Sequence, residues 1–185
     1  MTCVVGLKLG ANKGVIIGTD SMAVADDEVY VEHENNKIVE VRGMIMGFSG
    51  NSRAHNLVKH VLDHSKLNST SQDAFSFLVK DFVPRLLTLC EEAKCLKFED
   101  GEADWDCNIL VGVKDRLFNI QGNLQVFEVK DYDATGSGAP YALGSMASTV
   151  DMGINPEGRV KLALQAAAKH CTSVCGPFHY ANTRP

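Results

Sequence analysis

Three features are missing from this sequence, and each absence excludes a class of protein. No apolar run approaches the about 18 residues that a membrane-spanning helix needs. No basic stretch followed by an apolar segment and a small-residue cleavage site stands near residue 1, so we expect no signal peptide and a cytoplasmic location. No cluster of lysine and arginine could follow a phosphate backbone, and the net charge is -5, so we expect neither nucleic acid nor membrane as a partner.

The composition is that of an ordinary globular chain. With 185 residues, of which 45% are hydrophobic and 22% charged, the chain is long enough to bury a core without covalent staples. We therefore expect a single domain over residues 1–185. In a chain without a leader, the six cysteines are better interpreted as free thiols in a reducing compartment than as disulfides.

Two β-hairpins are predicted in the first 50 residues. Residues 3–9 and 14–19 are rich in Val, Ile and Leu, and residues 10–13 between them carry turn chemistry. Residues 37–41 and 43–49 repeat this form around Arg42 and Gly43. The nearly unbroken apolar run GMIMGF in the second hairpin indicates a strand buried on both faces.

Beyond Gly50 the apolar period changes to that of helices. One helix is predicted from five apolar positions on one face: Ala54, Leu57, Val58, Val61 and Leu62. A second helix is predicted after Ser71, with Pro84 bending it and with Phe75, Leu78, Val79 and Phe82 on one side. The acidic run FEDGEADWD that follows is interpreted as a surface loop.

Strands and then helices return in the second half. CNILVGV, RLFNI and QVFEV predict three strands with short turns between them, and helices are predicted after Pro140 and from Pro156 through LALQAAAKH. Strands and helices thus come in separate groups, which indicates α+β layers. A pair of sheets with helices outside would explain strands buried on both faces.

Four short stretches carry residues that could do chemistry: Thr2, GTDS around Asp20, NNKI with Lys37, and ATGSGAPYALG around Ser137. In this order they resemble the proteasome β-subunit family, including its HslV-like bacterial and phage members. TCVVGLKL resembles the family's first strand, GVIIGTDSMA its acidic motif, NNKI its lysine motif, GFSGNSRA its glycine turn and TGSGAPYALG its serine loop. The resemblance covers nearly the whole chain.

The resemblance implies an N-terminal-nucleophile (Ntn) hydrolase with a four-layer αββα sandwich, two antiparallel sheets between helix layers. It implies that Thr2 is the nucleophile once Met1 is removed, that Asp20 orients Lys37, and that Lys37 supplies positive potential beside the threonine hydroxyl. Ser137 would hydrogen-bond the terminal amine, and the backbone N–H of Gly50 would face the oxyanion. A free α-amine on the same residue can act as the base, so no distant histidine is needed.

The sequence departs from the family pattern at two places. Cys171 stands where the family usually has an aspartate near the end of its last long helix, with Thr172 or Ser173 left to supply the neighbouring hydroxyl. The typical acidic motif, DxRxT, continues with arginine and threonine, whereas this chain reads Asp20-Ser21-Met22-Ala23, so substrate contacts near Ala23 should differ.

Other interpretations of the cysteines and histidines are weaker. Cys3 could be a nucleophile only after trimming of two residues, and its side chain would point to the opposite face of the strand from Thr2. A metal cluster could be suspected from four residues, but their spacing matches no common zinc site: His170, Cys171, Cys175 and His179. Three histidines at near-helical spacing are expected on a solvated helix face: His55, His60 and His64. We expect no metal and no cofactor.

The leading hypothesis is a threonine peptidase that cleaves polypeptides or peptides through an acyl-enzyme on Thr2. The alternatives are a catalytically silent assembly subunit and an Ntn amidase for a small non-peptide amide. The family resemblance further implies a homo-oligomeric ring or related assembly and an ATP-dependent unfoldase as a partner. Pocket residues are expected near Ala23, Glu34 and Ser49.

Overall fold

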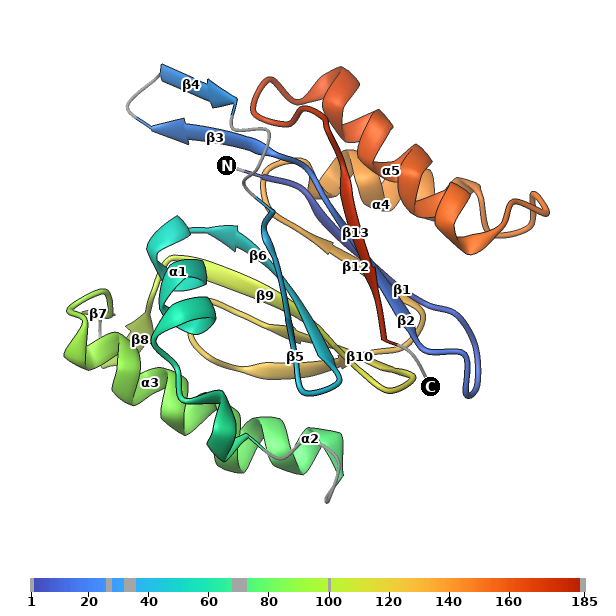
Figure 1. Cartoon of the computed structure of the whole chain (residues 1–185). Helices are drawn as coiled ribbons and strands as arrows, with labels where there is room; N and C mark the ends of the chain where they lie inside the picture. Colours follow the sequence, from blue (N-terminus) through green and yellow to red (C-terminus); the bar gives the residue numbers. More distant parts are fainter. Residues whose placement is uncertain (1, 26–27, 32–35, 68–72, 100, 184–185) are drawn as a thin grey trace.

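The computed structural model describes residues 2–25, 28–31, 36–67, 73–99 and 101–183. Two antiparallel sheets pack face to face, and each is covered by helices on its outer side (Figure 1). This is the αββα sandwich of the Ntn-hydrolase fold, so the predicted fold class is confirmed.

The first sheet carries the N-terminal hairpin, and its strands follow the order β12-β1-β2-β13. Their bounds are β1 Val4–Lys8, β2 Val15–Thr19, β12 Tyr132–Thr135 and β13 His179–Asn182. Val4 on β1 pairs with Thr19 on β2 and with Thr135 on β12. The start of β1 therefore lies level with the ends of both neighbours.

The second sheet has the order β11-β10-β9-β6-β5. Its strands are β5 Ile38–Val41, β6 Met44–Gly50, β9 Cys107–Val113, β10 Arg116–Ile120 and β11 Val126–Val129. β6 is buried along its length up to Ser49, as its apolar run predicts. Two further hairpins are formed by β3 Met22–Ala25 with β4 Glu28–Val31, and by β7 Lys97–Glu99 with β8 Glu102–Asp104.

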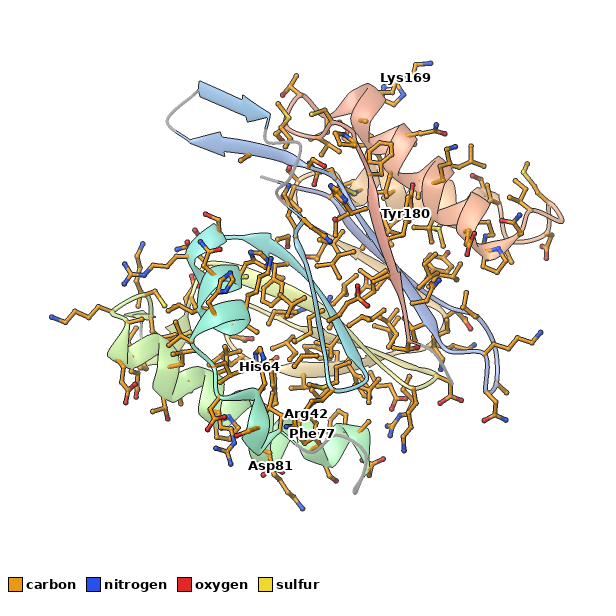
Figure 2. All side chains as sticks on the ribbon, in the orientation of Figure 1. Arg42, His64, Phe77, Asp81, Lys169 and Tyr180 are labelled. Atoms are coloured by element: carbon orange, nitrogen blue, oxygen red, sulfur yellow. The ribbon has the colours of Figure 1, made fainter. Side chains whose placement is uncertain are left out.

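Each sheet has its own helix layer. α4 Ala139–Ser148 and α5 Pro156–His170 cover the first sheet, and the second is covered by α1 Ser52–His60, α2 Ala74–Phe77, a π-helical turn Leu78–Phe82 and α3 Val83–Glu92. A short 3-10 turn, His64–Lys66, follows α1. Side chains fill the space between the sheets and between each sheet and its helices (Figure 2). None of the described helices is long and apolar enough to cross a membrane.

Several local predictions were wrong. α1 ends at His60, and Val61 beyond it is 59% exposed instead of buried. In the second helical stretch, Leu78 and Phe82 are buried as predicted, whereas Phe75 and Val79 are exposed and Phe77 is buried instead. The acidic run forms the β7–β8 hairpin where a loop was expected, and Trp105 at its end is buried.

Candidate active site

The five residues predicted for catalysis come together at one end of the sandwich. Thr2 lies just before β1, Asp20 just after β2, and Ser137 two residues after β12. From the second sheet, Lys37 lies just before β5 and Gly50 ends β6. The antiparallel register places these strand ends side by side, so residues far apart in sequence share one site.

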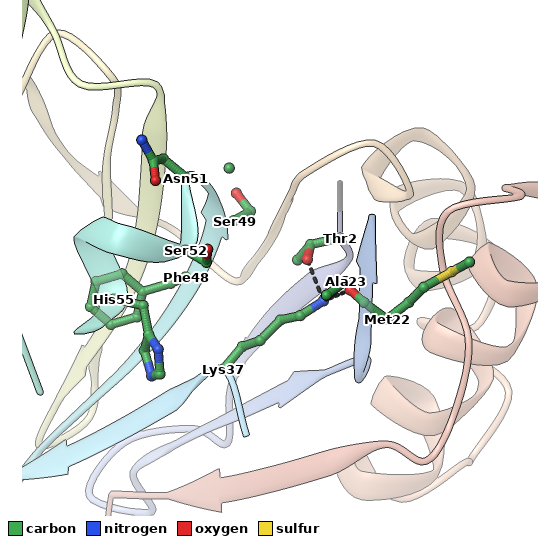
Figure 3. Close-up of a pocket in the computed structure, with 10 residues that line it drawn as sticks. Thr2, Met22, Ala23, Lys37, Phe48, Ser49, Asn51, Ser52 and His55 are labelled. Atoms are coloured by element: carbon green, nitrogen blue, oxygen red, sulfur yellow. Dashed lines mark hydrogen bonds between the residues drawn. The ribbon is translucent and has the colours of Figure 1, made fainter. Parts of the chain in front are cut away.

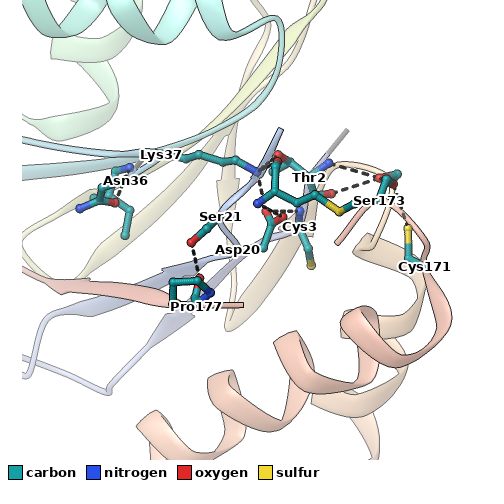
Figure 4. Close-up of polar contacts among 12 residues, drawn as sticks. Thr2, Cys3, Asp20, Ser21, Asn36, Lys37, Cys171, Ser173 and Pro177 are labelled. Atoms are coloured by element: carbon teal, nitrogen blue, oxygen red, sulfur yellow. Dashed lines mark hydrogen bonds and ion pairs between the residues drawn. The ribbon is translucent and has the colours of Figure 1, made fainter. Parts of the chain in front are cut away.

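Lys37 links the nucleophile candidate to the buried carboxylate. Its Nζ donates hydrogen bonds to Thr2 Oγ1 and to the Met22 carbonyl at 2.6 Å (Figure 3). It also donates to Asp20 Oδ1 at 2.8 Å (Figure 4). These three acceptors match the three protons of an ammonium group. The geometry therefore satisfies a charged lysine whose positive charge adjoins the threonine hydroxyl.

The pKa of Lys37 is shifted by two opposing effects. Burial is the larger and lowers the pKa of Lys37 below its ordinary value of 10.5, while the Asp20 carboxylate opposes this shift. The lysine should therefore lose its charge at a lower pH than a solvated lysine does.

Asp20 is fully buried, and its carboxylate accepts several hydrogen bonds. Oδ1 accepts from the Cys3 N–H at 3.0 Å as well as from Lys37, and Oδ2 accepts from the Met22 N–H at 3.0 Å. The Asp20 N–H in turn donates to the Cys3 carbonyl at 3.2 Å. Asp20 thus fixes the backbone next to Thr2 and orients Lys37 at the same time (Figure 4).

A chain of hydroxyl groups leads away from the Thr2 nitrogen. The Thr2 N–H donates to Ser137 Oγ at 3.3 Å, Ser137 Oγ lies 2.9 Å from Ser173 Oγ, and Ser173 Oγ lies 3.2 Å from Cys171 Sγ. Ser173, and not Thr172, therefore supplies the second hydroxyl that the sequence left open. Burial raises the pKa of the Cys171 thiol, but hydrogen bonds to Ser173 and Ser137 outweigh this effect, so its pKa is lowered overall.

Glycines allow the backbone to close around Thr2. Gly50 has a φ of 100°, and a Cβ there would lie 2.2 Å from the Asp106 carbonyl oxygen. Gly136 has a φ of 94°, and a Cβ there would lie 2.3 Å from the Thr2 carbonyl oxygen. No larger residue fits at either position without moving the backbone.

Cys3 lies on the other side of β1 from the site. Its side chain is fully buried in the core beneath α4 and α5, and burial raises its pKa to about 12. A thiol in this environment does not ionise near neutral pH, so its position argues against a nucleophilic role.

A cavity of about 80 Å³ opens beside Thr2 and Lys37. Ala23 and Ser49 line it as expected, whereas Glu34 lies outside the described residues. Sequence reasoning missed five other lining residues: Met22, Phe48, Asn51, Ser52 and His55. The sequence did contain a signal for these residues. The predicted helix begins close after Gly50, so its first turn has to lie beside the site.

The expectation that the three histidines share one solvated helix face was wrong for His55, which is buried, and for His64, which is half-buried in the 3-10 turn after α1. His55 is only 6% exposed and contacts the Phe48 ring edge to face, with 5.3 Å between ring centroids. His60 is exposed, and His64 Nε2 lies 2.6 Å from the Val58 carbonyl oxygen. No group of three or more potential metal ligands occurs among the residues that the structure describes.

The αββα sandwich is the fold of the Ntn hydrolases, and in this chain its strand ends gather a threonine, a lysine and an aspartate. Within that class, the chain belongs to the proteasome subunit family, whose sequence model matches residues 2–172. No curated protein matches the chain.

Solved structures share the fold at low sequence identity. The chain is similar to Thiobacillus denitrificans BPH, with a TM-score of 0.81, 19% identity, and coverage of 98% of this chain and 97% of that chain. A structure of the same protein in complex with epoxomicin gives a TM-score of 0.80 at 17% identity, covering 98% of this chain and 100% of that chain. Eukaryotic HslV from Trypanosoma brucei gives a TM-score of 0.69 at 15% identity and 98% coverage of each chain.

Proposed function

We propose that the chain is a threonine-type peptidase in which removal of Met1 makes Thr2 the N-terminal nucleophile. The observation that carries this proposal is the hydrogen bond from the Lys37 ammonium to Thr2 Oγ1, with Asp20 holding the lysine at 2.8 Å. Membership of the proteasome subunit family supports the same chemistry. Asp20, Lys37, Ser137 and Gly50 are the proposed supporting residues.

In the first step the free α-amine of Thr2 takes the proton from Oγ1, which attacks the carbonyl carbon of the substrate. Such an amine has an ordinary pKa of about 7.7 to 8.0, so a large fraction is neutral near physiological pH. The neighbouring Lys37 charge lowers the proton affinity of the hydroxyl. A new C–O bond to Thr2 forms, and the carbonyl oxygen becomes an oxyanion.

In the second step the carbon–nitrogen bond breaks and the amine returns the proton to the leaving nitrogen. Water, deprotonated by the same amine, then hydrolyses the ester and frees Thr2. The Gly50 N–H is the proposed oxyanion donor, and one such donor typically lowers the barrier by about 2.7 to 4 kcal/mol. Ser137 and Ser173 keep the amine aimed at the reacting atoms.

The first test is the intact mass of the purified protein before and after treatment with a peptide epoxyketone. This reagent needs a hydroxyl and an α-amine on one residue. Loss of Met1, one adduct per chain and turnover of fluorogenic peptides are expected. Thr2→Ala should lose the adduct and the turnover, whereas Thr2→Ser should keep both. Retained Met1 with no adduct would contradict the proposal.

Two alternative functions predict different results in the same assay. A silent assembly subunit, which the replacement of an acidic residue by Cys171 favours, would form its assembly without turnover even when correctly processed. An amidase for a small non-peptide amide would form the adduct and leave peptides uncut. Proteolysis of both folded and unfolded test chains would distinguish the peptidase from these.

We also propose an assembly, a location and a partner on the basis of membership of the proteasome subunit family. We infer a homo-oligomeric ring or related assembly in the cytoplasm that encloses the sites, because an unrestricted peptidase would damage other proteins. An ATP-dependent unfoldase is the proposed partner for folded substrates. Native mass spectrometry of the purified protein tests the assembly directly.

A further inference from the structure

A buried pair of hydroxyl groups joins the two sheets beside the candidate site. Ser49 Oγ lies 2.9 Å from Thr135 Oγ1, and both side chains are buried. Ser49 belongs to β6 in the second sheet, whereas Thr135 ends β12 in the first sheet. The hydrogen bond between them satisfies two buried polar groups and connects two strands that share no backbone ladder.

Each member of this pair adjoins a segment that the proposed reaction uses. Ser49 directly precedes Gly50, whose N–H is the proposed oxyanion donor. Thr135 lies two residues before Ser137, whose Oγ accepts a hydrogen bond from the Thr2 N–H at 3.3 Å. The hydroxyl pair therefore links the oxyanion side of the site to the nucleophile side.

The backbone between these segments is closely packed. A Cβ on Gly136 would lie 3.2 Å from Ser49 Cβ and 2.3 Å from the Thr2 carbonyl oxygen, so only a glycine fits between the two residues. The Gly138 N–H donates to the same Thr2 carbonyl at 3.1 Å. A shift of β6 at Ser49 would therefore reach the backbone of Thr2 through closely packed atoms.

The spacing that this pair holds is one on which the proposed reaction depends. The attacked carbonyl must lie beside Thr2 Oγ1 and the Gly50 N–H at the same time, and these two groups come from different sheets. A misplacement of about 1 Å between reacting groups can cost roughly a hundredfold in rate. Lys37 also reaches Thr2 from the second sheet, but through a long and flexible side chain that does not fix the backbone.

We propose that Ser49 and Thr135 are positioning residues that set the spacing between the oxyanion donor and the nucleophile. They act through Gly50 and Ser137 and take no part in proton transfer. The inference rests on the proposed peptidase function, and it goes further by naming a link between the sheets that the reaction needs. Loss of the link should lower kcat and leave KM nearly unchanged, because alignment matters in the transition state and not for initial binding.

The test measures kcat and KM for a fluorogenic peptide, together with the urea midpoint of each variant. Ser49→Ala and Thr135→Val each remove one hydroxyl and leave its partner unpaired. We expect kcat to fall about tenfold or more in both, and KM to change less than about twofold. Thr135→Ser keeps the hydroxyl, so it should keep kcat within about twofold of the unmodified protein.

The double variant separates positioning from stability. Ser49→Ala combined with Thr135→Val removes both hydroxyls, so the urea midpoint should recover much of the loss seen in either single variant. The link between the sheets is still absent, so kcat should stay as low as in the single variants. Recovery of kcat together with the midpoint would show that the pair only stabilises the fold, and would overturn the inference.

Thr149→Val is the matched control. Thr149 is also buried, and its Oγ1 donates to the Ser145 carbonyl at 2.8 Å just beyond the end of α4. It does not line the cavity beside Thr2. This variant should lower the urea midpoint and leave kcat unchanged. An equal loss of kcat would mean that any destabilisation slows the enzyme, which would contradict the positioning role.

Epoxyketone labelling distinguishes failure of this inference from failure of the proposed function. If the unmodified protein is labelled while Ser49→Ala and Thr135→Val keep full kcat, only the positioning role is overturned. If the protein is labelled without cutting peptides, the rate constant of labelling takes the place of kcat in every comparison. A protein freed of Met1 that is neither labelled nor active would overturn both the peptidase and the positioning role.

Discussion

At the scale of single residues, Lys37 determines how the site should respond to pH. The proposed rate rises as the Thr2 amine loses its proton and falls when Lys37 loses its own. Because burial lowers the pKa of Lys37, kcat/KM should decline at a pH below the ordinary lysine value of 10.5.

Lys37→Arg tests this assignment, since arginine stays protonated throughout the range. We expect a lower maximal kcat/KM, because the guanidinium is too large for the three acceptors, together with loss of the alkaline decline. An alkaline decline that persists unchanged in the variant would show that another group causes it. A stopped-flow or fluorogenic pH profile provides the measurement.

Cys171 is the residue that most separates this site from the family pattern, and Cys171→Asp should restore a carboxylate at the end of the hydroxyl chain. A charge-assisted hydrogen bond to Ser173 is stronger than the thiol contact at 3.2 Å, so kcat/KM should rise several-fold. Cys171→Ala should lower it.

The control for this prediction is a double-mutant cycle with Ser173→Ala, which removes the link through Ser173 and leaves only the direct contact between Cys171 and Ser137. In that background Cys171→Asp should have a smaller benefit. An undiminished gain without Ser173 would mean that the carboxylate does not act through the hydroxyl chain.

At the scale of elements, the turn from β6 into α1 sets the backbone beside Thr2. Gly50→Ala should both destabilise the fold and abolish activity, because its Cβ would lie 2.2 Å from the Asp106 carbonyl oxygen. Gly43→Ala is a matched control, since Gly43 also has a positive φ but has open space around its Cβ position. It should cost about 1–2 kcal/mol and leave kcat/KM unchanged.

The layer formed by α4 and α5 supports β1 from outside. Leu164 on α5 is fully buried, so Leu164→Ala should lower the free energy of unfolding by about 2–5 kcal/mol. Leu162 on the same helix is 40% exposed, and Leu162→Ala should change it by no more than about 0.5 kcal/mol. Chemical denaturation of both variants measures the difference, and equal losses would contradict the described packing.

The elements also show what the sequence could and could not predict. β6 and β9 were recognisable because burial on both faces leaves a continuous apolar run. β12 and β13 were missed because their short sequences, YDAT and HYAN, show no such pattern and depend on pairing with β1 and β2. The π-helical turn was missed because nothing in a regular helical period marks a change of register.

The site was predicted unevenly for a similar reason. Motifs identified Thr2, Asp20, Lys37 and Ser137, because each lies at the end of a strand with a distinctive sequence around it. His55 was misassigned to a solvated face, since its burial arises from the packing of α1 against β5 and β6 and not from a local pattern. Tertiary contacts of this kind have no signal in a single sequence.

At the scale of the whole molecule, the free energy of unfolding should depend on pH through the protonation of His55. Its pKa is about 4 when folded and about 6.5 when exposed, so between these values the unfolded chain binds a proton that the folded chain excludes. The contribution of the neutral imidazole to the free energy of unfolding is complete above pH 6.5. It is lost as pH falls toward 4, by at most about 3 kcal/mol.

Comparison of variants isolates this effect from other titrating groups. His55→Phe should make the free energy of unfolding less dependent on pH between 4 and 6.5, whereas His60→Phe should match the unmodified protein. Urea titrations at several pH values provide the measurement. Parallel curves for all three proteins would show that His55 does not carry the acid sensitivity.

The proposed catalytic residues are divided between the two sheets, with Thr2, Asp20 and Ser137 on the first and Lys37 and Gly50 on the second. Contacts such as that between Thr2 and Ser137 span 135 positions of sequence, and contacts this distant are slow to form. A chain still emerging from the ribosome lacks β12 and the serine loop. If the proposed mechanism holds, reactivity therefore has to wait until these segments are made and folded against β1, which would protect neighbouring nascent chains from an incomplete enzyme.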